Sequence, residues 1–170
     1  RICSCSFSRS SISSITIPSE VRIIGKYAFY DCRQLQQIEF SDESKLQTIE
    51  EGAFNGTSIS SITIPSEVTD LKEGWCYGTN KLIRVNVCPS NPRYSCLEEG
   101  MMIGKETQES NNYENLVFVA RDIKTITIPN FIKRICSYSF YNSSISRITI
   151  PSEVRIIGKY AFSLCKLLQK

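Results

Sequence analysis

The chain has 170 residues, of which 41% are hydrophobic and 22% charged, a composition typical of one ordinary globular domain. The formal net charge of +3 is too small to indicate binding to nucleic acid or to a membrane surface. The longest apolar run covers only residues 116–120, far fewer than the roughly 20 residues of a membrane-spanning helix, so we expect no direct insertion into a membrane.

A short motif recurs along the chain. Ile-Thr-Ile-Pro occurs four times, and degenerate copies of its strand lie at residues 38–40 and 85–87. Successive copies are 22 to 24 residues apart, except for one interval of 41 residues. A fixed period of this length indicates a solenoid, in which stacked turns share a core that no single turn could bury. The complete copies are at residues 15–18, 62–65, 126–129 and 148–151.

Each repeat begins with a very short predicted strand. Two apolar residues flank one polar residue, which puts both apolar side chains on the inner face of a parallel sheet. Proline then ends the strand, because it has no amide hydrogen to donate. The polar residues project outward, where they either bind a partner or serve only strand propensity and solubility. The candidate binding residues are Ser14, Thr16, Gln37, Glu39, Ser61, Thr63, Arg84, Asn86, Thr125, Thr127, Arg147 and Thr149.

Each repeat ends with a small residue followed by an aromatic residue, as in Ala28 and Phe29. We expect the small residue to let the chain turn closely and the ring to fill the centre of the coil. In the third repeat this interpretation assigns Cys76 to the small position and Tyr77 to the ring. Two positions before each ring lies a further aromatic column, which either forms a contact surface or packs neighbouring turns together. These aromatic candidates are Tyr27, Trp75, Tyr138 and Tyr160.

Residues 88–122 interrupt the period. They contain two apolar segments, at 100–104 and 116–119, separated by a polar run. This pattern predicts an inserted β-hairpin, which either spans two adjoining parts of the solenoid or supplies a contact site of its own. We therefore expect one domain over residues 1–170, with regular repeats in 1–87 and 123–170.

The two ends of the chain are near copies of each other. Residues 1–37 and 134–170 are identical at 28 of 37 positions, and both stretches cut through the repeat. We therefore expect the chain to be a fragment of a longer array. On this interpretation, the lack of a targeting signal indicates nothing about where the whole protein is located.

The pattern L-x-x-I-x-I-P-x-x-V-x-x-I-G-x-x-A-F-x-x-C is nearly complete in residues 12–32 and again in residues 145–165. It resembles the repeat of the BspA-like leucine-rich repeat family. Members of that family are known from surface proteins of mucosal bacteria and parasitic protists, and they look like adhesins that bind host matrix, cells or other microbes. The resemblance implies a cell-surface or extracellular location and a protein or glycoconjugate ligand.

Five of the eight cysteines fall at repeat positions, and we interpret these as small hydrophobic side chains in a stacked column: Cys3, Cys32, Cys76, Cys136 and Cys165. The chain contains no paired C-x-x-C motifs and no histidine, so we expect no zinc site. Cys88 and Cys96 flank the segment 91–94, and for this pair a disulfide stays open.

The missing histidine also removes the commonest general base and the usual partner of a serine or cysteine nucleophile. Glu20, Glu67 and Glu153 recur at one repeat position, which is typical of a solvated ladder rather than of paired catalytic carboxylates. No glycine-rich phosphate-binding loop is present. We expect neither enzymatic activity nor a cofactor.

Two asparagines, Asn55 and Asn142, begin glycosylation sequons in turns that the repeat places at the surface. Such matches also arise by chance, so both interpretations stay open.

The sequence as a whole predicts a β-rich, leucine-rich-repeat-like solenoid. We expect a right-handed coil of about six turns of about 23 residues, with short parallel strands, few helices and one inserted hairpin. The expected function is non-enzymatic recognition of a protein or glycoconjugate, on host matrix or a cell surface, by a segment of a surface adhesin. The alternative is an intracellular protein–protein interaction scaffold, because free cysteines fit a reducing compartment.

Overall fold

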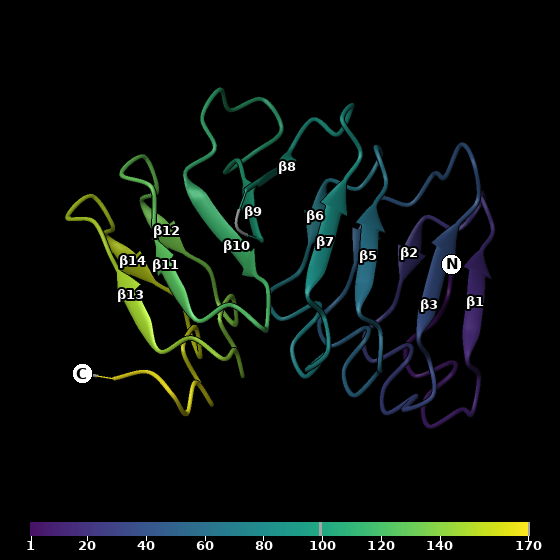
Figure 1. Cartoon of the computed structure of the whole chain (residues 1–170). Coiled ribbons are helices and arrows are strands. Elements are labelled where there is room, and N and C mark those ends of the chain that lie inside the picture. Colours follow the sequence, from purple (N-terminus) through teal and green to yellow (C-terminus); the bar gives the residue numbers. More distant parts are fainter. Residues whose placement is uncertain (99, 170) are drawn as a thin grey trace.

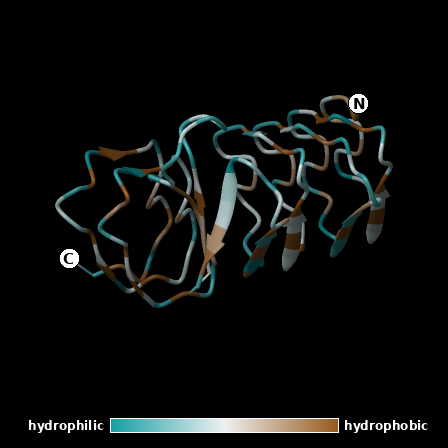
Figure 2. Ribbon diagram, turned by 90° about the horizontal axis from the view of Figure 1, so that it is seen from above, coloured by the Kyte–Doolittle hydropathy of each residue, from teal (hydrophilic) through white to brown (hydrophobic). Residues whose placement is uncertain are grey.

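The chain forms an elongated stack of coils, with the amino and carboxyl termini at opposite ends (Figure 1). The computed structural model describes residues 1–98 and 100–169. Fourteen short strands build the stack, and the described residues contain no helix. Figure 2 shows hydrophilic and hydrophobic segments alternating along the turns. The predicted β-rich solenoid of about six turns is therefore confirmed.

The first strand of each repeat lies on one side of the coil, which we call the strand face. Its strands pair in parallel, with Ile15 opposite Ile38, 23 residues later. Inward-pointing isoleucines such as Ile17 and Ile64 are completely buried. The strand face consists of three strand pairs: β1 (Ser14–Ile17) with β3 (Gln37–Phe40), β5 (Ser61–Ile64) with β7 (Arg84–Val87), and β11 (Thr125–Thr127) with β13 (Arg147–Thr149).

Two-residue strands form the second side of the coil. Except in the last of them, where Ile157 is exposed, their second residue points inward, and Ile24 and Ile49 are completely buried there. Residues on adjacent strands pair in parallel, as Ile24 does with Ile49. These strands are β2 (Ile23–Ile24), β4 (Thr48–Ile49) and β6 (Asp70–Leu71) before the insertion, and β12 (Arg134–Ile135) and β14 (Ile156–Ile157) after it.

The third side consists of turns, and stacked aromatic rings fill the coil behind them. Phe29 is completely buried between Phe7 and Phe54, whose ring centroids lie 5.1 and 5.7 Å away. The backbone also links these turns, because the Phe29 amide donates a hydrogen bond of 2.8 Å to the Ala53 carbonyl. Offset or edge-on packing of rings at such distances stabilises a core beyond the burial of area alone.

The third repeat differs from the predicted assignment by one position. Ile49 pairs with Leu71, and Gly52 and Gly74 each follow three residues later with a positive φ, which aligns these two glycines and puts Trp75 in the small position and Cys76 in the ring position. Both side chains are buried, and the indole packs edge-on against Phe54 with centroids 6.3 Å apart. A large and a small side chain have exchanged places, so the same space in the core is filled.

The insertion is a three-stranded antiparallel meander, one strand more than the predicted hairpin. β9 (Met101–Gly104) and β10 (Asn115–Val119) form the hairpin, with residues 105–114 as its loop. β8 (Tyr94–Leu97) pairs with the other edge of β9. β10 also pairs in parallel with β12, so the meander joins the second side of the coil. The loop projects beyond the neighbouring turns (Figure 1).

β9 and β10 form a wall between two hydrophobic cores. Met102 packs into the amino-terminal core, whereas Met101 and Ile103 pack into the carboxyl-terminal core, and all of β9 is buried. In β10, Leu116 faces the carboxyl-terminal core and Phe118 the other, with a register shift between them. A strand that is buried on both faces needs apolar residues at successive positions, which explains the unbroken apolar run.

Side chains of the meander also cap the free edge of β6. No strand pairs with this edge among the described residues. Instead, the Leu71 amide donates a hydrogen bond of 3.0 Å to the Tyr94 hydroxyl, and the Arg93 guanidinium donates to the Thr69 carbonyl. These bonds satisfy backbone groups at the strand edge that would otherwise lack a hydrogen-bond partner.

A buried arginine lies where the coil resumes after the meander. Arg121 is only 3% exposed, and its guanidinium donates to the Ser139 carbonyl at 2.9 Å and lies 4.6 Å from the centre of the Phe118 ring. Burial lowers the pKa of Arg121. The Arg121 amide donates a hydrogen bond to the Leu82 carbonyl, so the backbone hydrogen bonds between adjacent turns continue across the insertion.

Candidate functional site

All twelve polar residues that the sequence assigns to the outer side of the strand face are exposed. The strand pairing brings them together in rows, for example Ser14 beside Gln37 and Thr63 beside Asn86. Charged side chains are few in this set, namely Glu39, Arg84, and Arg147. The strand face is thus a polar surface of low charge that extends along the stack on both sides of the meander. The rows are Ser14, Thr16, Gln37 and Glu39; Ser61, Thr63, Arg84 and Asn86; and Thr125, Thr127, Arg147 and Thr149.

Tyrosines form a continuous row along the outside of the turns. The ring centroids of Tyr77 and Tyr138 lie 5.0 Å apart, although the meander separates these residues in the sequence, and those of Tyr138 and Tyr160 lie 5.3 Å apart. The hydroxyl oxygens of Tyr27 and Tyr77 are 3.0 Å apart and share a hydrogen bond. Burial, followed by this bond, raises the pKa of Tyr77. The tyrosine row consists of Tyr27, Tyr30, Tyr77, Tyr138, Tyr141 and Tyr160.

The candidate Trp75 does not belong to this row, which corrects the sequence-based assignment. Trp75 is 3% exposed and packs in the amino-terminal core, and Gly74 takes the equivalent position in the row. Sequence reasoning placed Tyr77 in the core, whereas the structure places it half-buried at the centre of the row.

Two glycines make room for the tyrosine row. Gly52 and Gly74 have φ angles of +62° and +71°, a backbone conformation that Tyr27 and Tyr138 share at the same repeat position. A Cβ atom on Gly52 would lie 2.4 Å from the Tyr27 ring, and one on Gly74 would lie 3.1 Å from the Tyr138 ring. Because two consecutive repeats have glycine at this position, the rings of Tyr27 and Tyr138 in the flanking repeats can extend across it and contact Tyr77.

A charged hollow of about 510 Å³ lies beside the tyrosine row. Lysines and glutamates line it together with Tyr138, and the Lys26 ammonium lies 2.7 Å from the Glu51 carboxylate. The hydrogen bond with Glu51 raises the pKa of Lys26. Because cations and carboxylates alternate here, the hollow has no strong preference for either sign of charge.

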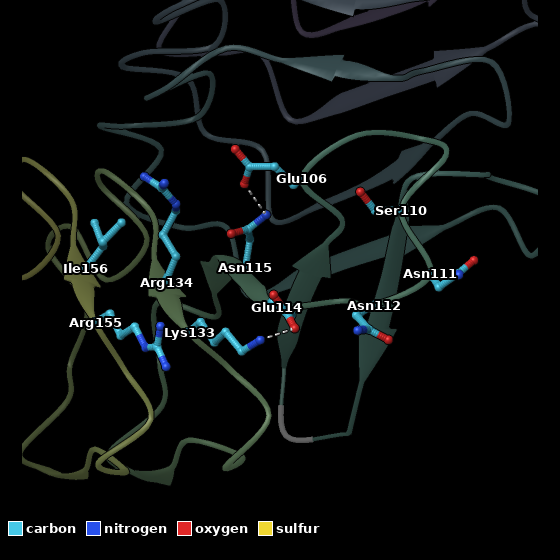
Figure 3. A pocket seen from close by; sticks show the side chains of 10 residues that line it. All are labelled: Glu106, Ser110, Asn111, Asn112, Glu114, Asn115, Lys133, Arg134, Arg155 and Ile156. Carbon is cyan, nitrogen blue, oxygen red and sulfur yellow. Dashed lines mark hydrogen bonds and ion pairs between the residues drawn. The ribbon is translucent and has the colours of Figure 1, made fainter.

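A second recess, which the sequence did not reveal, lies between the loop 105–114 and strands β10, β12 and β14 (Figure 3). It measures about 500 Å³, and Arg134, Arg155 and Ile156 contribute its strand side. A further cavity of about 480 Å³ lies against the same loop and is lined by Tyr113 and Phe131. Both cavities share four lining residues, so we treat them together as the loop groove. The shared residues are Asn111, Asn112, Glu114 and Lys133.

The two carboxylates of the loop groove have partners within the chain. The Lys133 ammonium lies 2.6 Å from a Glu114 carboxylate oxygen, and the Asn115 amide donates to Glu106 at 3.4 Å (Figure 3). In the part of the chain that the structure describes, the guanidinium groups of Arg134 and Arg155 form neither an ion pair nor a hydrogen bond.

The two sequon asparagines, Asn55 and Asn142, are half-buried in turns of the third side. The Thr57 hydroxyl of the first sequon is buried and donates a hydrogen bond of 2.8 Å to the Phe54 carbonyl. Glycosylation at either asparagine stays a prediction.

All eight cysteines have free thiols. Cys32 and Cys76 are buried, as the interpretation of small core side chains requires, whereas Cys3 and Cys5 are exposed on the first turn. The thiols of Cys88 and Cys96 bond elsewhere, the former lying 3.3 Å from the Ser90 hydroxyl and the latter donating to the Val85 carbonyl. The structure therefore shows no disulfide between them.

We expect the thiols to react with Ellman's reagent at widely different rates. Cys3 and Cys5 should react first, and Cys76 roughly 100-fold or more slowly, because a buried thiol needs local unfolding to become accessible. Burial also raises the pKa of Cys76 to about 11, which keeps its thiolate fraction small at neutral pH. Stopped-flow absorbance on the native chain measures these phases, and Cys76→Ser should remove only a slow one. A single fast phase for all thiols would contradict the placement of Cys76.

The recurring glutamates are solvated, as the sequence predicts. The Lys45 ammonium of the next turn lies 2.6 Å from Glu20 and lowers the pKa of that carboxyl through a hydrogen bond. Within residues 1–98 and 100–169, no three cysteine, aspartate or glutamate side chains are grouped in a way that could hold a metal ion. The same residues include no helix of the length and apolarity needed to cross a membrane.

Comparison with known proteins identifies one family and several solved structures with a similar fold. The family model described as BspA type leucine-rich repeat region matches residues 1–99 and 107–170 in six copies. The pneumococcal vaccine antigen PcpA superposes with a TM-score of 0.89 at 25% identity, over 99% of this chain and 41% of that one. A leucine-rich repeat protein from Eubacterium ventriosum ATCC 27560 superposes with a TM-score of 0.76 at 23% identity, over 95% of this chain and 48% of that one.

A leucine-rich cell surface protein from Faecalibacterium prausnitzii A2-165 superposes with a TM-score of 0.70 at 20% identity, over 93% of this chain and 46% of that one. The chain thus spans less than half the length of each of these three structures. No curated protein sequence matches it.

Proposed function

Because the chain belongs to the BspA-type leucine-rich repeat family, we propose that it is a partner-binding segment of a cell-surface adhesin. It recognises a protein or a glycoconjugate on host matrix or on another cell, and it does so without catalysis.

The strand face carries this proposal. Twelve polar side chains are exposed there in register, while the alternate residues of the same strands, such as Ile17 and Ile64, build the core. Core and surface positions are therefore separate, and the surface positions are available for a partner. Repeat proteins commonly bind through such an extended face. Because the set lacks aromatic residues, we expect each repeat to add little affinity and several repeats to act together.

The proposed surface location draws support from the likeness to PcpA, a vaccine antigen. Antibody labelling of intact and of permeabilised source cells tests it. Signal on intact cells agrees with an adhesin, and signal only after permeabilisation contradicts one.

The second candidate is an intracellular interaction scaffold that uses the same face. The exposed free thiols of Cys3, Cys5 and Cys96 favour it, because such thiols persist best in a reducing compartment. The labelling experiment decides between the two locations.

We expect charge reversal on the strand face to weaken binding to decellularised epithelial matrix. The double variant Arg84→Glu and Arg147→Glu should bind about tenfold more weakly, since charge complementarity steers and orders an interface. Both side chains are exposed, so folding should not change. Fluorescently labelled chain on coated plates gives the affinity, with the double variant Arg9→Glu and Arg22→Glu, at two exposed positions away from the strand face, as the charge-matched control. Equal affinity of the double variant and the unmodified chain would speak against the strand face.

A further inference from the structure

The loop groove has a chemistry that the strand face lacks. Arg134 and Arg155 lie apart from each other in the first cavity, and Ile156 lies beside Arg134, its partner in the parallel pairing of β12 with β14 (Figure 3). Neither guanidinium is bound by another side chain in the described residues. The planar fork of arginine binds carboxylate or sulfate oxygens through paired hydrogen bonds. Two such groups spaced along a groove fit a ligand with acid groups at intervals.

The middle of the loop groove offers neutral hydrogen-bonding groups. Asn111 and Asn112 are exposed and line both cavities, and Ser110 lies beside them. Side-chain amides and hydroxyls both donate and accept, which suits the hydroxyl groups of a sugar. The carboxylates Glu106 and Glu114 are occupied by Asn115 and Lys133, so they compete little for the arginines.

The far end of the loop groove is aromatic. Phe131 is 45% exposed, and it stands at the repeat position that holds glutamate in Glu20, Glu67 and Glu153. No core contact requires a large apolar side chain at this position in the other repeats. Tyr113 lies in the same cavity, where the Lys105 ammonium covers its ring at 5.1 Å. The uncovered phenyl ring of Phe131 is therefore available to pack against the apolar face of a sugar.

From this arrangement we infer that the loop groove binds a linear acidic saccharide, with carboxylate or sulfate groups on successive sugars. Arg134 and Arg155 hold the acid groups, the asparagines bind hydroxyls, and Phe131 packs on a ring face. Each cavity, at about 500 and 480 Å³, has the size of a small-ligand site. The site lies on the second side of the coil and is independent of the partner proposed for the strand face.

Titration calorimetry of the whole chain with three oligosaccharides tests this inference. A hyaluronan hexasaccharide supplies carboxylates alone, a heparin hexasaccharide supplies sulfates as well, and chitohexaose is neutral. We expect at least one acidic hexasaccharide to bind, more weakly as salt is added, and chitohexaose not to bind. Binding of hyaluronan assigns the site to carboxylates, and binding of heparin alone assigns it to sulfates.

Matched variants locate the site. Arg155→Ala should weaken acidic hexasaccharide binding about tenfold or more, whereas Arg22→Ala should not, because Arg22 holds the same repeat position without an overhanging loop. Phe131→Ala should also weaken binding, and Ile83→Ala, an equally exposed residue away from the groove, should not. All four side chains are exposed, so the variants should fold.

Three results would overturn the inference. The first is that neither acidic hexasaccharide binds. The second is that Arg22→Ala weakens binding as much as Arg155→Ala, which would indicate unspecific attraction to positive charge. The third is that a poly-glutamate peptide binds more tightly than the saccharides and is unaffected by Phe131→Ala, which would assign the groove to acidic protein segments instead.

Discussion

Replacing Phe29 by alanine is expected to lower the free energy of unfolding by about 3–5 kcal/mol. The ring is completely buried and stacks on Phe7 and Phe54 in the turns on either side. Its removal leaves a cavity that rigidly paired strands on the other two sides of the coil cannot close. Urea unfolding followed by circular dichroism measures the loss.

Two control variants separate the inward from the outward positions. Phe162→Ala makes the same change at the same repeat position, but Phe162 is half-buried and stacks on Phe140 only, at 4.8 Å, so we expect a smaller loss. Thr63→Ala, on the exposed side of β5, should change stability by no more than about 0.5 kcal/mol. Equal losses for all three variants would mean that the coil is not packed as described.

Replacing Gly52 by alanine is expected to destabilise the chain by about 2–4 kcal/mol. Part of this loss comes from the positive φ of +62°, which costs a residue with a Cβ atom about 1–2 kcal/mol. The rest comes from the new methyl group, which would lie 2.4 Å from the Tyr27 ring and must displace it. The displaced ring would lose its hydrogen bond with Tyr77.

A double-mutant cycle distinguishes these two causes. In a Tyr27→Ala background the methyl group would meet only the Tyr77 ring, at 3.1 Å, so Gly52→Ala should cost little more than the backbone part, about 1–2 kcal/mol. Chemical unfolding of the four proteins gives the coupling free energy. If Gly52→Ala costs the same in both backgrounds, contact with the Tyr27 ring contributes nothing to its effect.

The regular repeats could be predicted from the sequence because each one repeats the same division between buried and exposed positions. The alternation in Ile15, Thr16 and Ile17 is enough to assign both sides of a strand, and the spacing to Phe29 is enough to place the ring. These are local patterns, and the stacking of identical turns converts them directly into contacts between turns.

The third repeat is misassigned from the sequence because its residues imitate the motif one position too late. Cys76 followed by Tyr77 imitates the pair of a small residue and a ring. The structure shows that Trp75 supplies the ring from the preceding position instead. Gly74 and Gly52 both have a positive φ, which marks the correct alignment. The sequence does not reveal this, because these glycines make room for tyrosine rings that belong to other repeats.

The loop groove could not be predicted because it joins segments without a common period. Arg155 and Ile156 belong to the last repeat, whereas Asn111 and Asn112 belong to the loop of the meander. Only the parallel pairing of β10 with β12, and of β12 with β14, brings these segments together. One local signal exists, since Phe131 stands where three other repeats have glutamate.

The wall between the two cores restricts how this chain can vary among relatives. Most strands have a solvent-facing side on which substitutions cost little, but β9 has none, because Met101, Met102 and Ile103 are all buried. Substitutions should therefore accumulate on the exposed side of the strand face and in the loop 105–114. The buried residues of β9, which contact both cores, should change far less.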